Sequence, residues 1–363
     1  MNPLIPKISN SAIPHAQSRI ASFGLLAAAA IVVLSTTAVA QNSIVPEGSK
    51  VEKLFTGVML TEGVAVAPSG LVYFSDITFS NKTQQADGSF HAGHIWVFDP
   101  KTKKTRIFRS PSGMSNGIKF DASGNMLVCE GADYGGRRVT RTNMKTGQSF
   151  VIAGLFDGRE FNAPNDVTLD ETGRIYFSDP RYLGYEPIEQ PVMAVYRIDT
   201  DLSIHRIITD AGKPNGVCVS PDQKSLYVVC HDNGSTGVIP PIDGQEEPMP
   251  KKGHMQLMAY DLHENGTATF RKTLVNYYPQ DGPDGLCCDA KGNIYAAERD
   301  VTKPGIGVYS PEGKQLAFIP TELPTNVGFG RGDDANLLYI TAGSSLFRIR
   351  LANAGYQLPV KTP

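Results

Sequence analysis

The chain has 363 residues, with 34 Lys and Arg against 36 Asp and Glu, so its formal net charge is −2 at pH 7. Such an even balance, without a basic stripe, argues against nucleic acid as a partner. Its 36 Gly and 25 Pro are scattered between short apolar segments. Turn residues in this distribution predict an all-β protein.

The first 40 residues have the features of a secretory signal peptide. Lys7 and Arg19 precede an apolar run from Ile20 to Leu34, and small residues follow at 38–40. A membrane anchor is the alternative, but about 15 apolar residues are short for a span of about 20. We therefore expect export to the periplasm or beyond the cell, no membrane association after cleavage, and a single domain over residues 41–363.

A short phrase recurs six times along the remaining chain. Each copy holds one polar residue in register at its second position, continues as an alternating strand, turns at a tight loop that mostly contains Gly and returns as a second strand. The copies begin at Thr61, Ser115, Pro164, Pro214, Pro283 and Thr325. Their second residues are Glu62, Asn116, Asn165, Asn215, Asp284 and Asn326.

Further strand pairs lie between the phrases, for example residues 94–99 with 104–109 and residues 194–199 with 204–208. Two hairpins per repeat make a four-stranded sheet, so the sequence predicts a six-bladed β-propeller in preference to an open solenoid. Residues 49–55 are predicted to complete the last blade beside residues 345–350. Residues 233–253, rich in Gly, Pro and acidic side chains, are expected to form an exposed loop.

The ring of polar residues predicts a central divalent-metal site. Glu62 and Asp284 offer carboxylates, and Asn165 and Asn215 offer amide oxygens; hard oxygen ligands favour Ca²⁺, with Mn²⁺, Mg²⁺ or Zn²⁺ as alternatives in vitro. Asn residues also open strands because they favour turns. The Glu in the first copy and the Asp in the fifth are departures that turn chemistry does not require.

Other polar residues fall on the same rim, because the second strand of each hairpin ends beside the start of the first. Substrate contacts are therefore expected from Asn116, Asn165, Asp166, Arg181 and His231. The five cysteines lie in strand-like segments without a C-x-x-C spacing and are expected to be buried free thiols. Cys218 and Cys287 occupy equivalent places in neighbouring copies and could lie close together.

These motifs resemble the SMP-30/gluconolactonase/luciferin-regenerating-enzyme superfamily, and its bacterial gluconolactonases in particular. The resemblance is carried by TEGVAV with Glu62, FNAPNDV with Asn165, SDPRYLG with Asp179, PNGVCVSPD with Asn215 and GPDGLCCDAKGNIY with Asp284. Two departures stand out: Val64 and Val66 replace the family's usual Pro and Trp, and Ala163 replaces a substrate-binding Arg of the animal members.

The resemblance implies a six-bladed propeller with one catalytic metal that hydrolyses sugar lactones. It implies that Glu62, Asn215 and Asp284 are metal ligands, that Asn165 contacts metal or substrate, and that Asp284 is the general base. The hypothesis is that the metal polarises the lactone carbonyl while Asp284, or alternatively Asp166, deprotonates the attacking water.

The expected partner is thus a small lactone, and the expected assembly is a monomer or weak dimer. A phosphotriesterase acting at the same calcium site, and a secreted binding propeller without catalysis, remain alternatives.

Overall fold

The computed structural model describes residues 43–235 and 251–360. The predicted signal peptide and most of the predicted loop at 233–253 lie outside these residues. These described residues form one compact unit. Within the described part of the chain, no helix is long and apolar enough to span a membrane.

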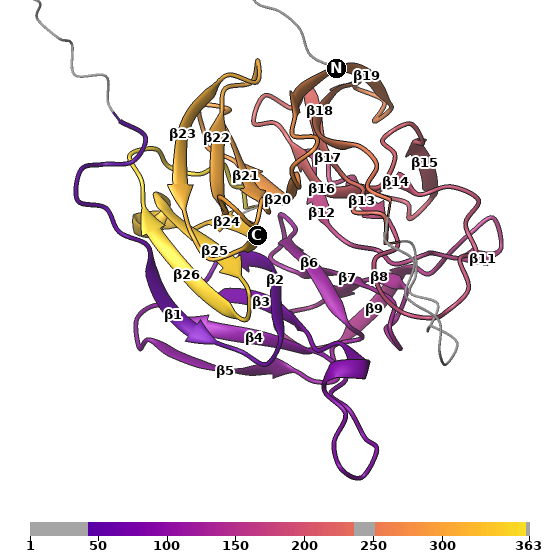
Figure 1. Cartoon of the computed structure of the whole chain (residues 1–363). Coiled ribbons are helices and arrows are strands. Elements are labelled where there is room, and N and C mark those ends of the chain that lie inside the picture. Colours follow the sequence, from indigo (N-terminus) through magenta and orange to yellow (C-terminus); the bar gives the residue numbers. More distant parts are fainter. Residues whose placement is uncertain (1–42, 236–250, 361–363) are drawn as a thin grey trace, which may run out of the picture. The chain divides into compact units, whose positions relative to one another are not determined.

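Six four-stranded antiparallel sheets make up the described residues (Figure 1). Blades 1 and 2 contain β2 (Leu60–Val66), β3 (Val72–Ile77), β4 (His94–Asp99) and β5 (Lys104–Arg109), then β6 (Ser115–Phe120), β7 (Met126–Glu130), β8 (Arg138–Thr142) and β9 (Ser149–Ala153). Blade 3 contains β12 (Val167–Leu169), β13 (Ile175–Asp179), β14 (Ala194–Ile198) and β15 (Ile204–Ile208). A small hairpin of β10 (Leu155–Phe156) and β11 (Arg159–Glu160) precedes it.

The second half of the unit repeats the same order. Blade 4 contains β16 (Pro214–Val219), β17 (Ser225–His231), β18 (Met255–Leu262) and β19 (Ala268–Asn276). Blade 5 contains β20 (Pro283–Cys288), β21 (Ile294–Glu298), β22 (Gly305–Tyr309) and β23 (Gln315–Pro320). Blade 6 contains β24 (Pro324–Phe329), β25 (Leu337–Ala342), β26 (Ser345–Arg350) and β1 (Glu52–Thr56). Two short 3₁₀ turns, η1 (Ser80–Lys82) and η2 (Gly332–Asp334), lie in loops.

The N-terminal strand closes the ring. β1 pairs antiparallel with β26, with Glu52 opposite Arg348 and Thr56 opposite Ser345. The last sheet therefore combines the two ends of the unit, as the sequence predicted. Closure leaves no blade without a neighbour, which protects the sheet faces from solvent.

The hydrophobic core lies between neighbouring sheets. Ala65 and Tyr73 of blade 1 pack with Ile118 and Val128 of blade 2, and equivalent clusters join the other neighbours. The innermost strands are almost wholly buried because sheets cover both of their faces. In contrast, outer strands such as β19 are largely exposed. In Figure 1 the innermost strands β2, β6, β12, β16, β20 and β24 gather around the centre.

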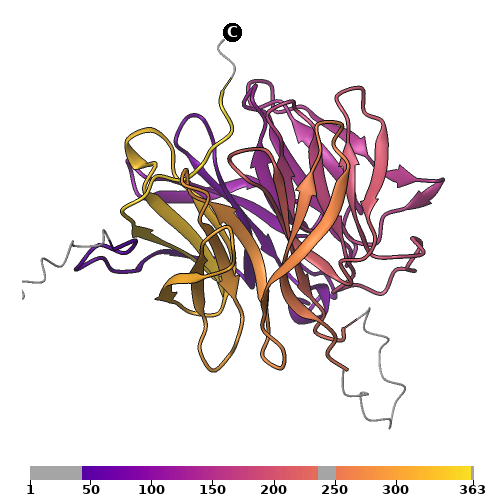
Figure 2. The ribbon, with the colours of Figure 1, turned by 90° about the horizontal axis from the view of Figure 1, so that it is seen from above.

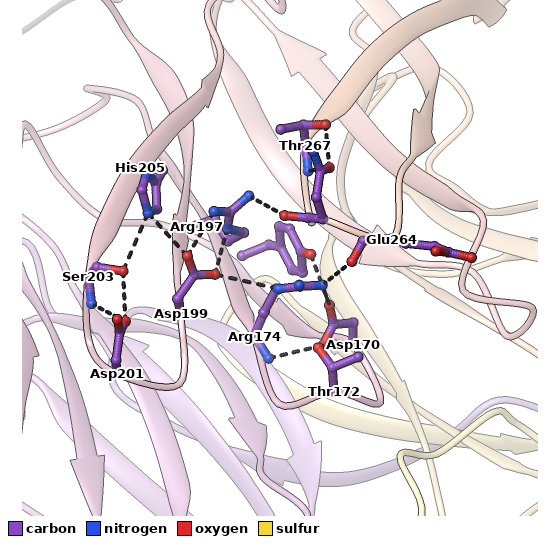
Figure 3. Close-up of polar contacts among 12 residues, drawn as sticks. Asp170, Thr172, Arg174, Arg197, Asp199, Asp201, Ser203, His205, Glu264 and Thr267 are labelled. Atoms are coloured by element: carbon purple, nitrogen blue, oxygen red, sulfur yellow. Dashed lines mark hydrogen bonds and ion pairs between the residues drawn. The ribbon is translucent and has the colours of Figure 1, made fainter.

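Polar contacts supplement this packing between blades 3 and 4 (Figure 3). Arg174 and Arg197 of blade 3 each donate to a backbone carbonyl in the β18–β19 turn, at Glu264 and Asn265 respectively. Arg197 also pairs with Asp199 at 2.7 Å. These two guanidinium groups therefore hold the β18–β19 turn of blade 4 against blade 3.

The two ends of the channel differ (Figure 2). At one end the C-terminal segment crosses the inner strands: the Tyr356 N–H donates to the Cys288 carbonyl, and the Gln357 side chain donates to the Phe329 carbonyl at 2.6 Å. A cavity of about 80 Å³ lies there, lined by Lys119, Cys218 and Cys287 among others. The predicted site is at the other end, where the inner strands begin.

All five cysteines are buried and free, as expected. The Cys218 thiol contacts that of Cys288 in the next blade, with the two sulfurs 3.7 Å apart.

Candidate functional site

The six polar residues at the starts of the inner strands form a ring around the channel. Glu62, Asn116, Asn215, Asp284 and Asn326 are the second or third residues of β2, β6, β16, β20 and β24, and Asn165 lies two residues before β12. Five of them are buried, and Asp284 retains 13% of its side-chain surface. The repeat therefore places six equivalent polar side chains at one end of the channel.

Glycines after these residues let the blades approach closely. A Cβ at Gly63 would collide with the Asn116 carbonyl of the next blade, and a Cβ at Gly216 would meet the Asp284 carbonyl. Blade 3 differs because Asp166 stands in this place. Its Oδ2 accepts the Val217 N–H of blade 4 at 3.1 Å, whereas its buried Oδ1 has no hydrogen-bond partner among the described residues.

Glu62 and Asp284 repel each other across the channel. Burial raises the pKa of Glu62 well above its ordinary value, and the nearby Asp284 carboxylate raises it further. The Gly63 N–H and the Arg299 guanidinium act in the opposite direction. Burial also raises the pKa of Asp166, and Asp284 adds to that shift. Three carboxylates therefore converge on a region that favours positive charge.

This donor set fits a divalent cation. Among the described residues no three His, Cys, Asp or Glu side chains gather closely enough to hold a metal by themselves. The predicted set has only two carboxylates, so the amide oxygens of Asn165 and Asn215 would have to contribute. The buried Oδ1 atoms of Asp166 and Asn116 have no hydrogen-bond donor among the described residues. A bound cation or a donor group of a ligand would satisfy them.

The Tyr182 side chain lies beside site residues of both blade 4 and blade 5. Its hydroxyl donates to the His231 carbonyl at 2.9 Å. Burial raises its pKa well above the ordinary value, the Asp284 carboxylate raises it further, and a side-chain hydrogen bond with Asn215 lowers it. The tyrosine thus lies beside both Asn215 and Asp284. The buried ammonium of Lys213 lies 4.1 Å from its ring centroid, a cation–π contact.

His231 contacts the start of β20 next to Asp284, whereas Arg181 contacts the loop between β13 and β14. The His231 Nδ1 lies 3.0 Å from the Pro283 carbonyl, so Nδ1 carries the proton and donates. Burial lowers its pKa, and Asp284 opposes that shift. The Arg181 guanidinium instead donates to the Glu186 carbonyl at 2.6 Å and is almost fully buried. Its described contacts are with a loop and not with Asp284.

The acidic residues at the ends of the second strands hold loops in place. Asp76 accepts backbone N–H groups of Val58 and Met59 together with the Trp96 indole, and Asp179 accepts those of Asn162 and Ala163. Glu130 is bound by two arginines, and Glu298 by the Tyr309 hydroxyl. These carboxylates are engaged in structural contacts at the rim.

Sequence reasoning gave no role to three residues of this region: Tyr182, Lys213 and Arg299. Arg299 pairs with Asp284 at 3.2 Å. Tyr182 and Arg299 lie on the predicted rim just beyond the second strands, and Lys213 immediately precedes the fourth copy, but the repeat pattern carried no signal for a role at any of the three. The available signals were sequence neighbours: Lys213 precedes Pro214-Asn215, and Arg299 follows Glu298.

Among known proteins, the chain is similar to several lactone hydrolases. A gluconolactonase from Zymomonas mobilis is 30% identical over 263 residues, covering 68% of this chain and 65% of that protein. The lactonohydrolase oryL of Aspergillus oryzae is 27% identical over 273 residues, covering 69% of this chain and 60% of the relative. The matched region thus spans less than two thirds of the length of either relative.

Solved structures share the fold. A gluconolactonase from Xanthomonas campestris superposes with a TM-score of 0.68 at 23% identity, covering 85% of this chain and 91% of its own. A calcium-binding regucalcin from Agrobacterium tumefaciens has a TM-score of 0.63 at 17% identity, with 88% and 99% coverage. The model of the SMP-30/gluconolactonase/LRE-like region matches residues 60–344. By this match over most of its length, the chain belongs to the SMP-30/gluconolactonase/LRE-like family.

Proposed function

We propose that this protein is a metal-dependent lactone hydrolase whose site is the ring of polar residues at the open end of the channel. The observation that carries the proposal is the convergence of the Glu62 and Asp284 carboxylates, from blades 1 and 5, beside the Asn165 and Asn215 carboxamides. Family membership and the lactone-hydrolysing relatives support the reaction class. Ca²⁺ is the proposed cation because all four ligands are hard oxygen donors.

The cation, held by Glu62, Asn165, Asn215 and Asp284, would act as a Lewis acid toward the lactone carbonyl. The residues of the chain supply positioning and proton transfer. Asp284 accepts a proton from water as the water oxygen bonds to the carbonyl carbon. As the ring C–O bond breaks, the leaving alkoxide oxygen takes this proton from Asp284, which regenerates the carboxylate and gives an open hydroxy acid.

Surrounding groups hold the reacting carboxylate in place. The Arg299 pair orients Asp284, while Tyr182 lies beside both Asp284 and Asn215. Asn165 is positioned to donate its amide N–H to the developing oxyanion, provided its oxygen faces the cation. Asp166 is the second candidate base, since its Oδ1 is buried without a partner.

The test is hydrolysis of glucono-1,5-lactone and unsubstituted δ-valerolactone by cation-depleted protein, followed by acid release in a pH-stat. Addition of Ca²⁺ should restore turnover, and Asp284→Asn should abolish it together with tight calcium binding. Glu298→Gln is the matched control, because that carboxylate binds Tyr309 and is not part of the proposed ligand set. Calcium-independent turnover would rule out the metal role.

A phosphotriesterase would hydrolyse a triester such as paraoxon but neither lactone. A binding propeller would hydrolyse none of these compounds, and calcium would raise only its melting temperature.

We also propose that the protein acts after export. This rests on the charged, apolar and small-residue order of residues 1–40. N-terminal sequencing of protein recovered from outside the cytoplasm should begin near residue 41. An intact Met1 would contradict cleavage.

A further inference from the structure

Two buried thiols meet between blades 4 and 5, at the end of the channel that the C-terminal segment covers. Cys218 lies on β16 and Cys288 on β20, and these two strands are neighbours in the ring (Figure 1). The two sulfur atoms are 3.7 Å apart. Both side chains belong to the apolar cluster between the two blades. The proposed lactone hydrolysis uses neither thiol, so the pair is free to serve a different chemistry.

The strands that carry the two thiols approach each other closely. A Cβ at Gly216, two residues before Cys218, would lie 2.5 Å from the Asp284 carbonyl oxygen of β20. A disulfide bond has an S–S distance of about 2.0 Å, so the two sulfurs must come about 1.7 Å closer than they are now. Rotation about the two Cα–Cβ bonds is the movement that brings them together. A covalent link between the blades therefore requires a change in side chains that are already in contact.

The surroundings make the two thiols unequal. The hydrogen bond with the Cys288 thiol lowers the pKa of Cys218, and the Lys119 ammonium lowers it further, against the opposing effect of burial. The same hydrogen bond raises the pKa of Cys288, and burial adds to that shift. The thiolate is the form of cysteine that attacks an oxidant. Cys218 is therefore the thiol that reacts first, with Cys288 as the second thiol beside it.

A small cavity gives a reagent access to this pair. It is the cavity of about 80 Å³ under the C-terminal segment, and Cys218, Cys288 and Lys119 are among the residues that line it. One water molecule takes about 30 Å³ in the liquid, so the cavity has room for roughly two or three molecules of this size. Hydrogen peroxide fits this space, whereas a peptide disulfide such as oxidised glutathione is far too large. Packing alone would not require a lysine ammonium beside the thiols.

We propose that Cys218 and Cys288 are a peroxide-reactive pair that forms a disulfide bond between blades 4 and 5. The Cys218 sulfur attacks one oxygen of hydrogen peroxide, the O–O bond breaks, and a sulfenic acid and one water are formed. The Cys288 sulfur then attacks the sulfenic sulfur, the S–O bond breaks, and the hydroxyl leaves with the Cys288 proton as a second water. Two thiols lose two electrons to one peroxide, which is reduced to two waters.

The disulfide would tie together two strands of the proposed site. Cys218 follows Asn215 on β16, and Cys288 follows Asp284 on β20. The two cysteines are 70 positions apart in the chain. A link over this length restricts the unfolded chain, so the oxidised protein should unfold at a higher denaturant concentration than the reduced one. The oxidation is independent of the proposed lactone hydrolysis, and either can hold without the other.

The experiment treats the folded, fully reduced protein with hydrogen peroxide and then analyses its intact mass and its unreduced tryptic peptides. We expect the loss of two hydrogen atoms and a link between the peptides of residues 207–224 and 273–291. This measurement uses the wild-type chain and needs no variant to fold. Oxidised glutathione should leave the folded protein without the link. Equal cross-linking by this larger reagent would overturn the cavity as the route to the thiols.

Variants identify which thiols are joined, because the second peptide contains both Cys287 and Cys288. Cys288→Ala should abolish the link, leave a sulfenic acid at Cys218 that dimedone traps, and remove the rise in denaturant midpoint on oxidation. Cys287→Ala is the matched control, since Cys287 is the neighbour in β20 but packs between blades 5 and 6, and the link should persist in it. A link that survives Cys288→Ala, or no link in the folded wild-type protein, would overturn the proposal.

Discussion

The Arg299 guanidinium lies 3.2 Å from the Asp284 carboxylate and also donates to the Pro324 carbonyl of the next blade at 2.9 Å. The arginine is thus fixed at the joint between blades 5 and 6 while its charge faces the site. A cation bound by Asp284 would share this carboxylate with a like-charged neighbour. Arg299 therefore limits the affinity of the site for a cation at the same time as it orients the ligand.

Replacement of Arg299 by Gln should tighten calcium binding. Loss of a nearby positive charge removes repulsion on the order of 1 kcal/mol for partly solvated groups, equivalent to roughly fivefold in affinity. Titration calorimetry with Ca²⁺ measures the change directly. Arg348→Gln is the control, because Arg348 pairs with Glu52 on the ring-closing strands. Weaker binding in Arg299→Gln would mean that orientation of Asp284 outweighs repulsion.

Asp179 should make stability depend on pH. Burial raises its pKa from 3.8 to about 7, and the N–H groups of Asn162 and Ala163 oppose the shift. Because the folded pKa lies above the unfolded one, the contribution of this group is fully present below pH 3.8 and is lost as pH rises toward 7.

Asp179→Asn removes that titration, so wild-type stability relative to the variant should fall between about pH 4 and pH 7 and stay level above that. The decline should not exceed a few kcal/mol, at about 1.4 kcal/mol per pKa unit. Denaturant melts of both proteins at several pH values give the difference, in which other titrating groups cancel. A constant offset across this range would show that Asp179 keeps an ordinary pKa in the folded protein.

The repeated phrase was sufficient to predict the blades, because strand alternation and Gly turns are local properties. Residues 94–99 and 104–109 were predicted as a strand pair and form β4 and β5 with the same bounds. Ring closure followed from counting: an unpaired N-terminal strand had to complete the last sheet. The position of the polar ring followed in turn from the register of the inner strands.

Contacts between blades were harder to predict, as the cysteines illustrate. Cys218 and Cys287 occupy equivalent positions, so both side chains point toward the following blade: Cys218 packs against blade 5, and Cys287 against blade 6. Cys288 faces the opposite way, because successive strand side chains alternate, and it meets Cys218. No role was predicted for the rim residues Tyr182, Lys213 and Arg299 for a related reason, since the loops beyond the strands do not repeat.

Gly266 should be intolerant of substitution because two arginines cover it (Figure 3 shows the surrounding contacts). Its φ is +77°, and a Cβ there would lie 2.9 Å from atoms of Arg174 and Arg197. Gly158 has a similar φ of +75° with open space around it, which makes it a matched control. Gly158→Ala should lower the free energy of unfolding by about 1 kcal/mol from backbone strain alone. Gly266→Ala should lower it further, because it also weakens the Arg174 and Arg197 contacts between blades 3 and 4. Chemical denaturation measures both, and equal losses would show that the arginines move aside freely.

Phe55 should be essential to ring closure. It projects from β1 and lies 4.9 Å from the Trp96 ring and 5.9 Å from Phe74 of blade 1, measured between centroids. Phe55→Ala should cost about 3 kcal/mol, as for aromatic truncation at a packed site. Phe150→Ala is the control, because Phe150 is 55% exposed on the outer strand β9.

Trp96 is the single tryptophan of the chain, so its fluorescence reports selectively on the contact between β1 and blade 1. In the Phe55 variant, the emission should shift to longer wavelength at a lower denaturant concentration than the circular dichroism of the sheets changes. Coincident transitions would show that the ring opens only when the whole propeller unfolds.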